Sequence, residues 1–347
     1  SDDLFRYRGE GLLQAHGGNP YQSRPADPAW ETLRDETYPR VPAKDFKAGY
    51  GPLTELIQRW TYRAVAAFTP NPWTQVFWFK LPAALFDLGI IAALAGLLVA
   101  KGLPADRVLV YAWSPLPVFE FWAAGHNDAI AIFFVVLALL LAARYCWTWA
   151  FAALTLAAGA KIWPLILFPL FIGWRGFRPL RSYQWWIAIP VALALARPYW
   201  SNVSENVRFM SGFLGGWRNN DSVYGLLLWL TGDQYPAKYT AFAIVIGTAL
   251  LLTLLAWPIE RAALWLIVVM LAVSANCHPW YLTWIVPLLA FHPVPPLLLW
   301  TALMPLAYRV VIEWTLLGEW HGSTPWRWLI YVPIYGLLAA TAAVRLA

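Results

Sequence analysis

Long apolar runs separated by short polar segments constrain the fold of this sequence more than any other feature. A helix that crosses a lipid bilayer needs roughly 20 consecutive apolar residues, and several runs approach that length. Only 13% of the residues are charged, whereas a soluble domain usually carries about 25%. The charges are therefore too few to cover a soluble surface, and the sequence predicts an all-α polytopic membrane protein.

The distribution of these runs divides the chain into two regions. Residues 1–75 are polar and rich in Pro, Gly and Arg, and we expect them to form an external loop with short amphipathic helices. Residues 76–347 are expected to form a transmembrane bundle, with external loops at 197–222 and 311–326. The runs interpreted as spans are 77–100, 108–124, 128–144, 149–173, 184–198, 240–257, 262–276, 280–292, 295–310 and 327–345.

Two shorter stretches are expected to lie at the membrane surface. Glu55–Ala67 has a helical apolar rhythm that includes Trp60 and Val65, which is typical of an interfacial helix. The apolar stretch 222–231 is too short to span and is predicted to be interfacial as well. The chain opens on Ser1-Asp2-Asp3 without an initiator Met, so we expect a preceding transmembrane helix to lie outside this numbering.

The placement of basic residues predicts the orientation in the membrane. Short loops rich in Lys and Arg belong in the cytoplasm, and such loops explain the net charge of +6 better than nucleic-acid binding does. Residues 1–75 are then external, provided that the run 149–173 is broken. Pro164 lacks a backbone donor and disfavours helix at the residue before it, so we predict a break at Lys161–Pro164 that leaves Lys161 on the external side. The basic residues of the cytoplasmic loops are Lys101, Arg107, Arg175, Arg178, Arg181 and Arg261.

With this orientation, the unusual polar residues gather on the external side. Ionisable groups at membrane depth are costly and indicate function: a carboxylate can take a proton from an attacking hydroxyl, and cations can stabilise a departing phosphate. Each residue also has a structural explanation, such as a helix cap for Asp2 and Asp3, so the hypothesis depends on their convergence. The residues are Asp2, Asp3, Arg6, Tyr7, Glu10, His126, Asp128, Lys161, Arg197, Tyr199, Arg218, Asn219, Asp221 and His278.

Short motifs occur along the chain in a characteristic order. They are Ser1-Asp2-Asp3-Leu4-Phe5-Arg6-Tyr7, Gly18-Asn19-Pro20-Tyr21, Tyr50-Gly51-Pro52-Leu53, Ser114-Pro115-Leu116 with Glu120, Gly125-His126-Asn127-Asp128, Lys161-Ile162-Trp163-Pro164, Trp217-Arg218-Asn219-Asn220-Asp221-Ser222 and His278-Pro279-Trp280-Tyr281. Over nearly its whole length the chain thereby resembles the polyprenyl-phosphate-sugar-dependent glycosyltransferases of the GT-C superfold, in particular their bacterial mannosyltransferase-like branch. The chain has Gly9-Glu10-Gly11 where relatives often carry Trp-Asp-Gly, so the resemblance assigns no firm role to Glu10.

This resemblance implies a GT-C-type helical bundle and a reaction. A hexose, with mannose as the implied sugar, would pass with inversion from a polyprenyl-phosphate donor to a lipid or glycan acceptor. The base would be an acidic residue of the first external loop, Asp3 in preference to Asp2. The residues implied to hold the donor phosphate or lipid are Lys161, His278, Arg197 and Arg218. Those implied to contact substrate are Arg6, Tyr7, Glu10, Tyr50, His126, Asp128, Asn219, Asp221 and Tyr281.

The resemblance also implies where the protein acts. It would be a multi-pass protein of the bacterial inner (cytoplasmic) membrane, surrounded by membrane lipids, with its active site facing the periplasm. Its partners would be the sugar donor and the acceptor, and no nucleic acid. The Asp2-Asp3 pair could hold a divalent cation such as Mg²⁺ or Mn²⁺, but two carboxylates do not make a metal site.

Two other functional classes stay open at this point. A secondary transporter of a small polar or anionic solute would also contain broken helices and intramembrane charges, but the sequence shows no internal repeat. A structural or assembly protein of the membrane would not need His, Lys, Asp and Arg to converge. An interfacial cavity beside a large external loop would favour the enzyme, and a sealed site at the midplane would favour the transporter.

Overall fold

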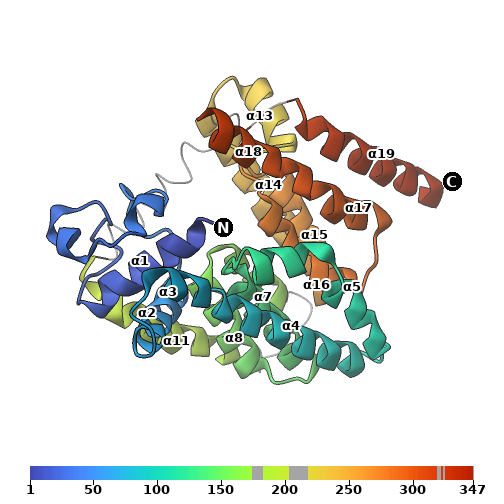
Figure 1. The fold of residues 1–347 in the computed structure, drawn as a ribbon. Helices are drawn as coiled ribbons and strands as arrows, with labels where there is room; N and C mark the ends of the chain where they lie inside the picture. Colours follow the sequence, from blue (N-terminus) through green and yellow to red (C-terminus); the bar gives the residue numbers. More distant parts are fainter. Residues whose placement is uncertain (174–182, 203–217, 319–321, 323–324, 347) are drawn as a thin grey trace. The chain divides into compact units, whose positions relative to one another are not determined.

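The computed structural model of this chain describes residues 1–173, 183–202, 218–318, 322 and 325–346 (Figure 1). The elements in these ranges are helical, and the one pairing of strand type among the described residues is an isolated bridge between Asn219 and Asn276. The prediction of an all-α protein is therefore confirmed. Outside the described residues lie Arg175, Arg178 and Arg181 of the predicted cytoplasmic loop, and 203–217, 319–321 and 323–324 of the predicted external loops.

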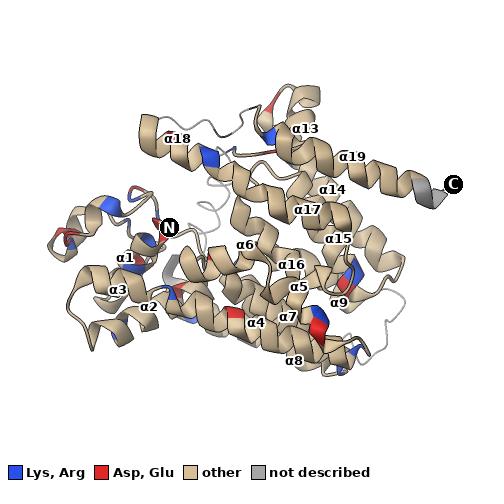
Figure 2. Cartoon of the chain, turned by 45° about the vertical axis from the view of Figure 1, so that its right-hand side comes forward, with Lys and Arg blue, Asp and Glu red and all other residues tan. Residues whose placement is uncertain are grey.

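Three helical stretches in the described part of the chain are long and apolar enough to cross a membrane. They are Pro72–Ala100, Gln234–Leu254 and Pro295–Leu317, and shorter apolar helices occupy Asp128–Ala143, Trp147–Ala160, Trp163–Ile172 and Arg327–Ala343. Figure 2 shows α8 and α17 without charged residues, whereas α1 carries both signs of charge. These helices agree with the predicted membrane protein.

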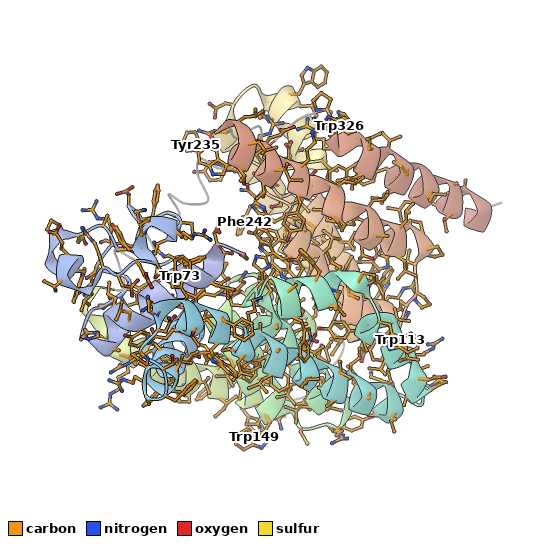
Figure 3. All side chains as sticks on the ribbon, in the orientation of Figure 1. Trp73, Trp113, Trp149, Tyr235, Phe242 and Trp326 are labelled. Atoms are coloured by element: carbon orange, nitrogen blue, oxygen red, sulfur yellow. The ribbon has the colours of Figure 1, made fainter. Side chains whose placement is uncertain are left out.

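Large apolar side chains project outward from the helices. The exposed fractions of Trp113, Trp149 and Phe242, which Figure 3 labels, are 78%, 66% and 66%. Exposing apolar surface to water costs about 25 cal/mol per Å², whereas lipid tails are as apolar as these side chains. The outward distribution of apolar residues is therefore the one expected of helices that face lipid.

The described residues divide into two compact units. Unit 1 takes those within Ser1–Leu97, Val118–Leu165 and Leu180–Gly216, and unit 2 takes those within Leu98–Pro117, Ile166–Pro179 and Trp217–Ala347. The helices of unit 1 are α1 (Asp3–Ala15), η1 (Pro28–Leu33), η2 (Tyr38–Arg40), α2 (Pro52–Ala66), α3 (Pro72–Trp78), α4 (Leu81–Ala100, of which the last turn belongs to unit 2), η4 (Val118–Ala123), α7 (Asp128–Ala143), α8 (Trp147–Ala160), η6 (Trp185–Ile187), α11 (Ala188–Ala196) and η7 (Arg197–Asn202).

Unit 2 holds most of the C-terminal half of the chain. Within it α14 packs against α13 and α15, and α17 packs against α19. Its helices are η3 (Ala105–Val108), α5 (Leu109–Ala112), α6 (Pro115–Pro117), α9 (Phe168–Ile172), α13 (Val223–Thr231), α14 (Gln234–Leu254), α15 (Ile259–Ala272), η8 (Pro279–Trp284), α16 (Val286–Leu289), α17 (Pro295–Leu303), η9 (Met304–Tyr308), α18 (Arg309–Leu317) and α19 (Arg327–Leu346), while η5 (Trp163–Leu167) lies across the boundary between the units.

Several predicted spans besides 149–173 are not continuous α-helices. The stretch 108–124 consists of α5, α6 and the π-helix η4; 184–198 contains α11 between two 3₁₀ segments; 280–292 contains η8 and α16; and 295–310 contains α17, the 3₁₀ helix η9 and the start of α18. Prolines at 115, 190 and 287 interrupt the first three stretches, because proline lacks the N–H that a helix interior requires. Each of these predicted spans therefore contains more than one helical segment.

The predicted break at Lys161 is present. Helix α8 ends at Ala160, and Lys161 has an extended backbone with φ −140° and ψ 151°. The 3₁₀ helix η5 then begins at Trp163. Pro164 has no N–H to donate to the Ala160 carbonyl, so α8 cannot continue through it, and Lys161 leaves the regular helical surface.

The N-terminus of α2 is fastened to the end of α8. The backbone N–H of Gly51 and the hydroxyl of Thr54 both donate to the carbonyl oxygen of Ala160, at 3.1 and 3.0 Å. A Cβ atom at Gly51 would overlap with the carbonyl of Gly159, so only glycine permits this close approach. As a result, Tyr50 is held beside Lys161.

Helix α2 buries its polar side and exposes apolar residues. Thr54, Glu55 and Gln58 are buried, and α2 packs against α1 and α8 (Figure 1). Trp60 is 62% exposed. This arrangement suits the predicted interfacial helix, whose apolar side faces lipid, and it places a polar layer beneath α1.

Candidate functional site

Asp3, the predicted base, begins α1. Asp2 occupies the N-cap position but makes no side-chain cap hydrogen bond, so the capping explanation for Asp2 does not hold. The backbone N–H of Asp3 donates to the Ser1 hydroxyl at 3.1 Å. The Asp3 side chain is 31% exposed, which leaves its carboxylate accessible to a substrate while the residues that follow it are buried.

His126 lies between two carboxylates. Its Nδ1 is 2.8 Å from Oε2 of Glu120, and its Nε2 is 3.5 Å from Oδ2 of Asp3. Glu120 and His126 are 0% and 3% exposed. His126 was expected to contact substrate, and the structure instead turns both of its ring nitrogens toward acidic side chains of the protein.

Local backbone structure holds this histidine in place. The π-helix η4 carries Glu120, and the backbone N–H of His126 donates to the Glu120 carbonyl at 2.9 Å. Gly125 turns the chain with φ +75°, a backbone conformation that favours glycine. A Cβ at Gly125 would lie 2.8 Å from a methyl group of Leu4, so the turn packs closely against α1 next to Asp3.

Lys161 pairs with Asp128. The Nζ atom of Lys161 lies 2.6 Å from Oδ2 of Asp128, the first residue of α7. Asp128 is buried, while Lys161 is 16% exposed. The ammonium also lies 5.9 Å from the centre of the Tyr50 ring. The structure thus brings together Lys161, predicted to hold phosphate, with Asp128 and Tyr50, predicted to contact substrate.

Tyr7 and Tyr50 connect these groups. Their rings meet edge to face at 5.3 Å. Burial, then the neighbouring Tyr50 and the Asp3 carboxylate, raise the pKa of Tyr7 well above its usual value. Burial, then Asp3 and Glu10, do the same for the pKa of Tyr50. Both phenols are therefore neutral hydroxyl groups near Asp3, suited to hydrogen bonding.

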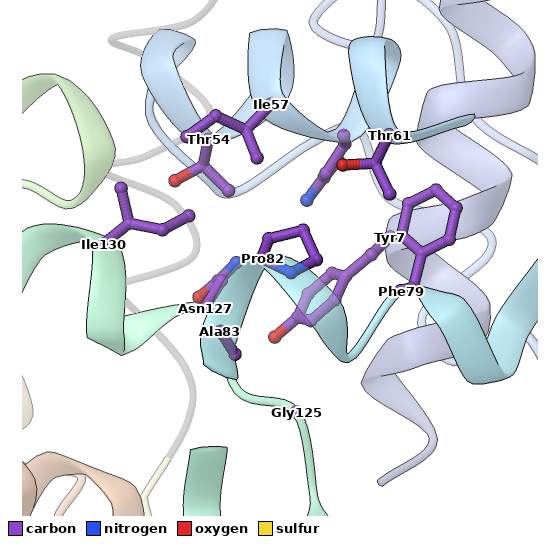
Figure 4. Close-up of a pocket in the computed structure, with 11 residues that line it drawn as sticks. Tyr7, Thr54, Ile57, Thr61, Phe79, Pro82, Ala83, Gly125, Asn127 and Ile130 are labelled. Atoms are coloured by element: carbon purple, nitrogen blue, oxygen red, sulfur yellow. The ribbon is translucent and has the colours of Figure 1, made fainter. Parts of the chain in front are cut away.

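A small cavity opens beside Tyr7. Figure 4 shows Tyr7, Thr54 and Asn127 around it, contributed by α1, α2 and the loop after Gly125. Its volume is about 20 Å³, enough for a water molecule. Neither polar atom of the buried Asn127 amide has a hydrogen-bond partner in the described chain. The amide is therefore available to a water molecule or a hydroxyl group that enters the cavity.

Arg6 and Glu10 belong to a separate buried network. Arg6 Nε donates to Glu10 Oε1 at 2.6 Å, and the same guanidinium donates to the carbonyls of Ala43 and Phe46 at 2.8 Å. Beneath them, the Gln14 amide donates to Glu55. These hydrogen bonds hold the loop after α1 against the helix. Arg6 and Glu10, which were predicted to contact substrate, thus bind to each other and to residues 43 and 46 of the protein.

Burial decides the ionisation of this second network. It raises the pKa of Glu55 well above its usual value, and the charge of Glu10 raises it further. The pKa of Glu10 is also raised by burial, against the lowering effect of the Arg6 guanidinium. Two carboxylates that lie close together in a buried site cannot both ionise without a large cost. Glu55 is therefore the protonated member, and Glu10, which is paired with Arg6, is the ionised one.

In unit 2, Asp221 binds two arginines. It accepts from Nε and Nη2 of Arg218 at 2.9 and 2.8 Å and from Nη1 of Arg327 at 2.8 Å. Asp221 is 0% exposed. Arg218 and Asp221 are predicted site residues, whereas Arg327 is not, because its position 106 residues further along the chain gives no local signal of the pairing.

His278 and its neighbours form a further polar group of unit 2. The Asn219 amide nitrogen lies 3.0 Å from Nδ1 of His278, and the His278 ring stacks on Trp280 at 4.4 Å. Tyr281 meets His278 edge to face. The structure thus brings together the predicted residues Asn219, His278 and Tyr281. Arg197, exposed at the start of η7 in unit 1, makes none of the site contacts described above.

Metal ligands do not gather in the described part of the chain. No group of three or more His, Cys, Asp or Glu side chains there could hold a metal ion. Asp2 and Asp3 supply only two carboxylates, and Mg²⁺ takes six ligands of near-octahedral geometry. Binding of a divalent cation by Asp2 and Asp3 stays a prediction, and the described residues supply no third His, Cys, Asp or Glu ligand beside this pair.

Comparison with known proteins supplies one match. No curated protein and no solved structure is significantly similar to this chain. A family model described as alpha-(1->6)-mannopyranosyltransferase, N-terminal domain, matches residues 1–177. This match takes in Asp3, Glu120, His126, Asp128 and Lys161, and it covers 177 of the 347 residues. The chain therefore belongs to the alpha-(1->6)-mannopyranosyltransferase family and is a glycosyltransferase of mannosyltransferase type.

Proposed function

We propose that this protein transfers mannose from a polyprenyl-phosphate donor to a lipid or glycan acceptor, with inversion, at the periplasmic face of the bacterial inner membrane. Membership of the mannopyranosyltransferase family supports the sugar transfer, and the apolar helices support a membrane location. A lipid-linked donor suits an enzyme whose polar residues adjoin lipid-facing helices. The family does not favour a secondary transporter.

The observation that carries the proposal is the cluster built around Asp3 in unit 1. Asp3 supplies an accessible carboxylate, and Lys161 supplies a partly exposed ammonium. Tyr7 and Tyr50 lie near Asp3, and Tyr50 also lies beneath Lys161. A base and a cation thus border the same pair of neutral phenols, as a transfer away from a phosphate requires.

The chemistry is a single displacement. The acceptor oxygen attacks the anomeric carbon and gives its proton to Asp3, which acts as the general base. The bond between the anomeric carbon and the phosphate oxygen breaks, and the electron pair leaves with the phosphate. Attack opposite to the leaving group inverts the configuration at the anomeric carbon. The ammonium of Lys161 stabilises the phosphate as its charge increases.

Unit 2, taken by itself, carries the other residues that the sequence predicts to contact the donor. Arg218, backed by the buried Asp221, presents a guanidinium that is 36% exposed. A planar guanidinium can bind phosphate through two parallel hydrogen bonds. His278, stacked on Trp280, supplies a second nitrogen group. Contact of these two residues, and of Asn219 and Tyr281, with the donor stays a prediction from the sequence.

Asp3→Asn tests the assignment of the base. We expect transfer from a polyprenyl-phosphate mannose to fall roughly 10²- to 10⁴-fold, the usual effect of losing a general base, while the protein still accumulates in the membrane. Asp2→Asn is the matched control, because Asp2 is exposed and caps nothing, and it should retain most activity. Undiminished transfer by Asp3→Asn would contradict the proposed function.

The donor is tested separately with purified protein in proteoliposomes. Labelled polyprenyl-phosphate mannose, polyprenyl-phosphate glucose and a nucleotide-linked mannose are supplied one at a time. Product should form with the polyprenyl-phosphate mannose, and the anomeric configuration of the product, measured by NMR, should be inverted relative to the donor. Product from the nucleotide-linked sugar alone would overturn the proposed donor class.

A further inference from the structure

We infer that His126 is a positioning residue that, anchored by Glu120, donates a hydrogen bond from Nε2 to the catalytic carboxylate of Asp3. This inference rests on the proposed function, because it presupposes Asp3 as the base. It gives Glu120 a role that the predicted site does not contain. It also changes the expected role of His126 from contacting substrate to orienting the group that reacts.

The contacts favour a doubly protonated ring. Nδ1 faces Glu120 at 2.8 Å and Nε2 faces Asp3 at 3.5 Å. A neutral imidazole has only one N–H, so a neutral ring would turn a lone pair toward one of the two carboxylates. The imidazolium donates to both. A distance of 3.5 Å is long for a hydrogen bond, and such bonds commonly shorten once substrate is bound.

Burial explains why Glu120 is needed. A buried charge is tolerated when it is paired and hydrogen-bonded, and Glu120 is wholly buried. Glu120 and the imidazolium together form a neutral buried pair. The pair can then turn an N–H toward Asp3 without placing an uncompensated charge in the interior.

Other charged groups surround this arrangement. Asp3 approaches from α1, and Asp128 and Lys161 form the ion pair at the start of α7. Lys80 packs on the turn at Gly125 that precedes His126. Tyr7 and Tyr50 are neutral hydroxyl groups near Asp3. The opposite charges of Lys161 and Asp128 neutralise each other. Glu120 and Asp3 are therefore the carboxylates with which the two N–H groups of the His126 ring interact.

A second variant series tests the inference. His126→Gln keeps a polar side chain but removes the ring, and we expect kcat to fall roughly 10- to 100-fold, as for other residues that orient a reactive group, with KM changed less than about threefold. Glu120→Gln keeps an acceptor for Nδ1–H but removes the charge. Its kcat should also fall, with KM changed less than about threefold, because Nδ1–H then lacks the charged partner that orients the ring.

Asp87→Asn is the matched control. Asp87 is a buried carboxylate of α4 that accepts a hydrogen bond from Trp122 of η4 at 2.9 Å, so its replacement disturbs the same π-helix without removing Glu120. Its kcat should stay close to that of the wild type even if its stability falls. If Asp87→Asn and Glu120→Gln lower kcat equally, Glu120 acts only through the structure of η4, and the inference is overturned.

A spectroscopic measurement keeps the test independent of activity. The chain has five histidines, and in ¹⁵N-histidine-labelled protein the signal missing from His126→Gln identifies this ring. We expect the signal of a ring with both nitrogens protonated in wild type and a changed signal in Glu120→Gln at the same pH. A neutral ring in wild type across the active pH range would overturn the inference. Full activity of Asp3→Asn would instead overturn the proposed function, so the two failures are distinguishable.

Discussion

The Nζ atom of Lys161 lies 2.6 Å from Oδ2 of Asp128, although 33 positions separate the two residues. Lys161 follows the end of α8, and Asp128 begins α7, so the pair joins the broken end of one helix to the start of its neighbour. Helices α7 and α8 pack along each other. The ion pair thus fixes a cation at one end of a helical hairpin.

Replacing one partner of this pair should destabilise the protein. Lys161→Gln leaves the buried Asp128 carboxylate without its ammonium, and we expect unfolding in detergent to become easier by about 3 kcal/mol. The double variant with Asp128→Asn should recover most of that loss, since no uncompensated charge then remains. Glu313→Gln is the control, because its partner Arg309 is half exposed and surface pairs contribute roughly 0–1 kcal/mol. Equal losses in the single and double variants would contradict an energetic coupling between the two side chains.

The buried Glu55 should make stability depend on pH. Burial raises its pKa, and the charge of Glu10 adds to this effect, so the folded state binds this proton more tightly than the unfolded state. The stabilisation is complete below the pKa of the unfolded chain, about 4.3, and is lost as the pH rises through the folded pKa. Glu55→Gln should therefore gain stability relative to wild type as the pH is raised from 4 to 8.

Thermal unfolding of the purified protein across that pH range measures this difference. Glu31→Gln is the control, because the Glu31 side chain is 73% exposed and its replacement should leave the slope of stability against pH unchanged. A wild-type slope retained in Glu55→Gln would show that Glu55 does not carry the effect.

Gly51→Ala should separate α2 from α8. The added methyl group would overlap with the carbonyl of Gly159, a backbone group that cannot move away cheaply. We expect a loss of roughly 1–3 kcal/mol, typical of overpacking, and lower activity because Tyr50 shifts away from Lys161. Gly49→Ala is a close control: a Cβ at Gly49 has open space around it. Similar losses at both positions would show that the contact with Gly159 is not the cause.

The two arginines that bind Asp221 should contribute unequally to stability. The Arg327 side chain is 15% exposed and that of Arg218 is 36% exposed, so Arg327→Gln removes the more buried partner. We expect it to cost about 3 kcal/mol and Arg218→Gln to cost about 1 kcal/mol. Chemical unfolding in detergent gives the ranking. Arg218→Gln should raise the KM for the donor more than Arg327→Gln does. A greater loss of stability in Arg218→Gln together with a greater rise of KM in Arg327→Gln would contradict these roles.

Some features of the site could be predicted from the sequence because their causes are local. Pro164 explains the end of α8 at Ala160, since proline has no N–H to donate to the carbonyl four residues earlier. The missing N–H of Pro115, Pro190 and Pro287 likewise indicates the interrupted segments that hydropathy alone joined into spans. Hydropathy records how apolar a stretch is, whereas proline decides whether its helix is continuous.

Other features depend on which distant side chains meet. Arg6 and Glu10 were expected at the substrate, but the loop at Ala43–Phe46 returns to α1 and takes the Arg6 guanidinium. Arg327 meets Asp221 across 106 positions. No local pattern encodes such meetings, because they follow from the path of the folded chain.

The sequence by itself determined that this chain is a helical membrane protein with acids and bases among its apolar runs, because apolar length, charge content and proline act within a few residues of one another. The tertiary structure alone decided that Glu120, His126 and Asp3 stand in a row and that Lys161 faces Asp128. Helix packing makes that decision, since it brings carboxylates from η4 and α1 to the two sides of one ring and so gives each charge a partner away from water.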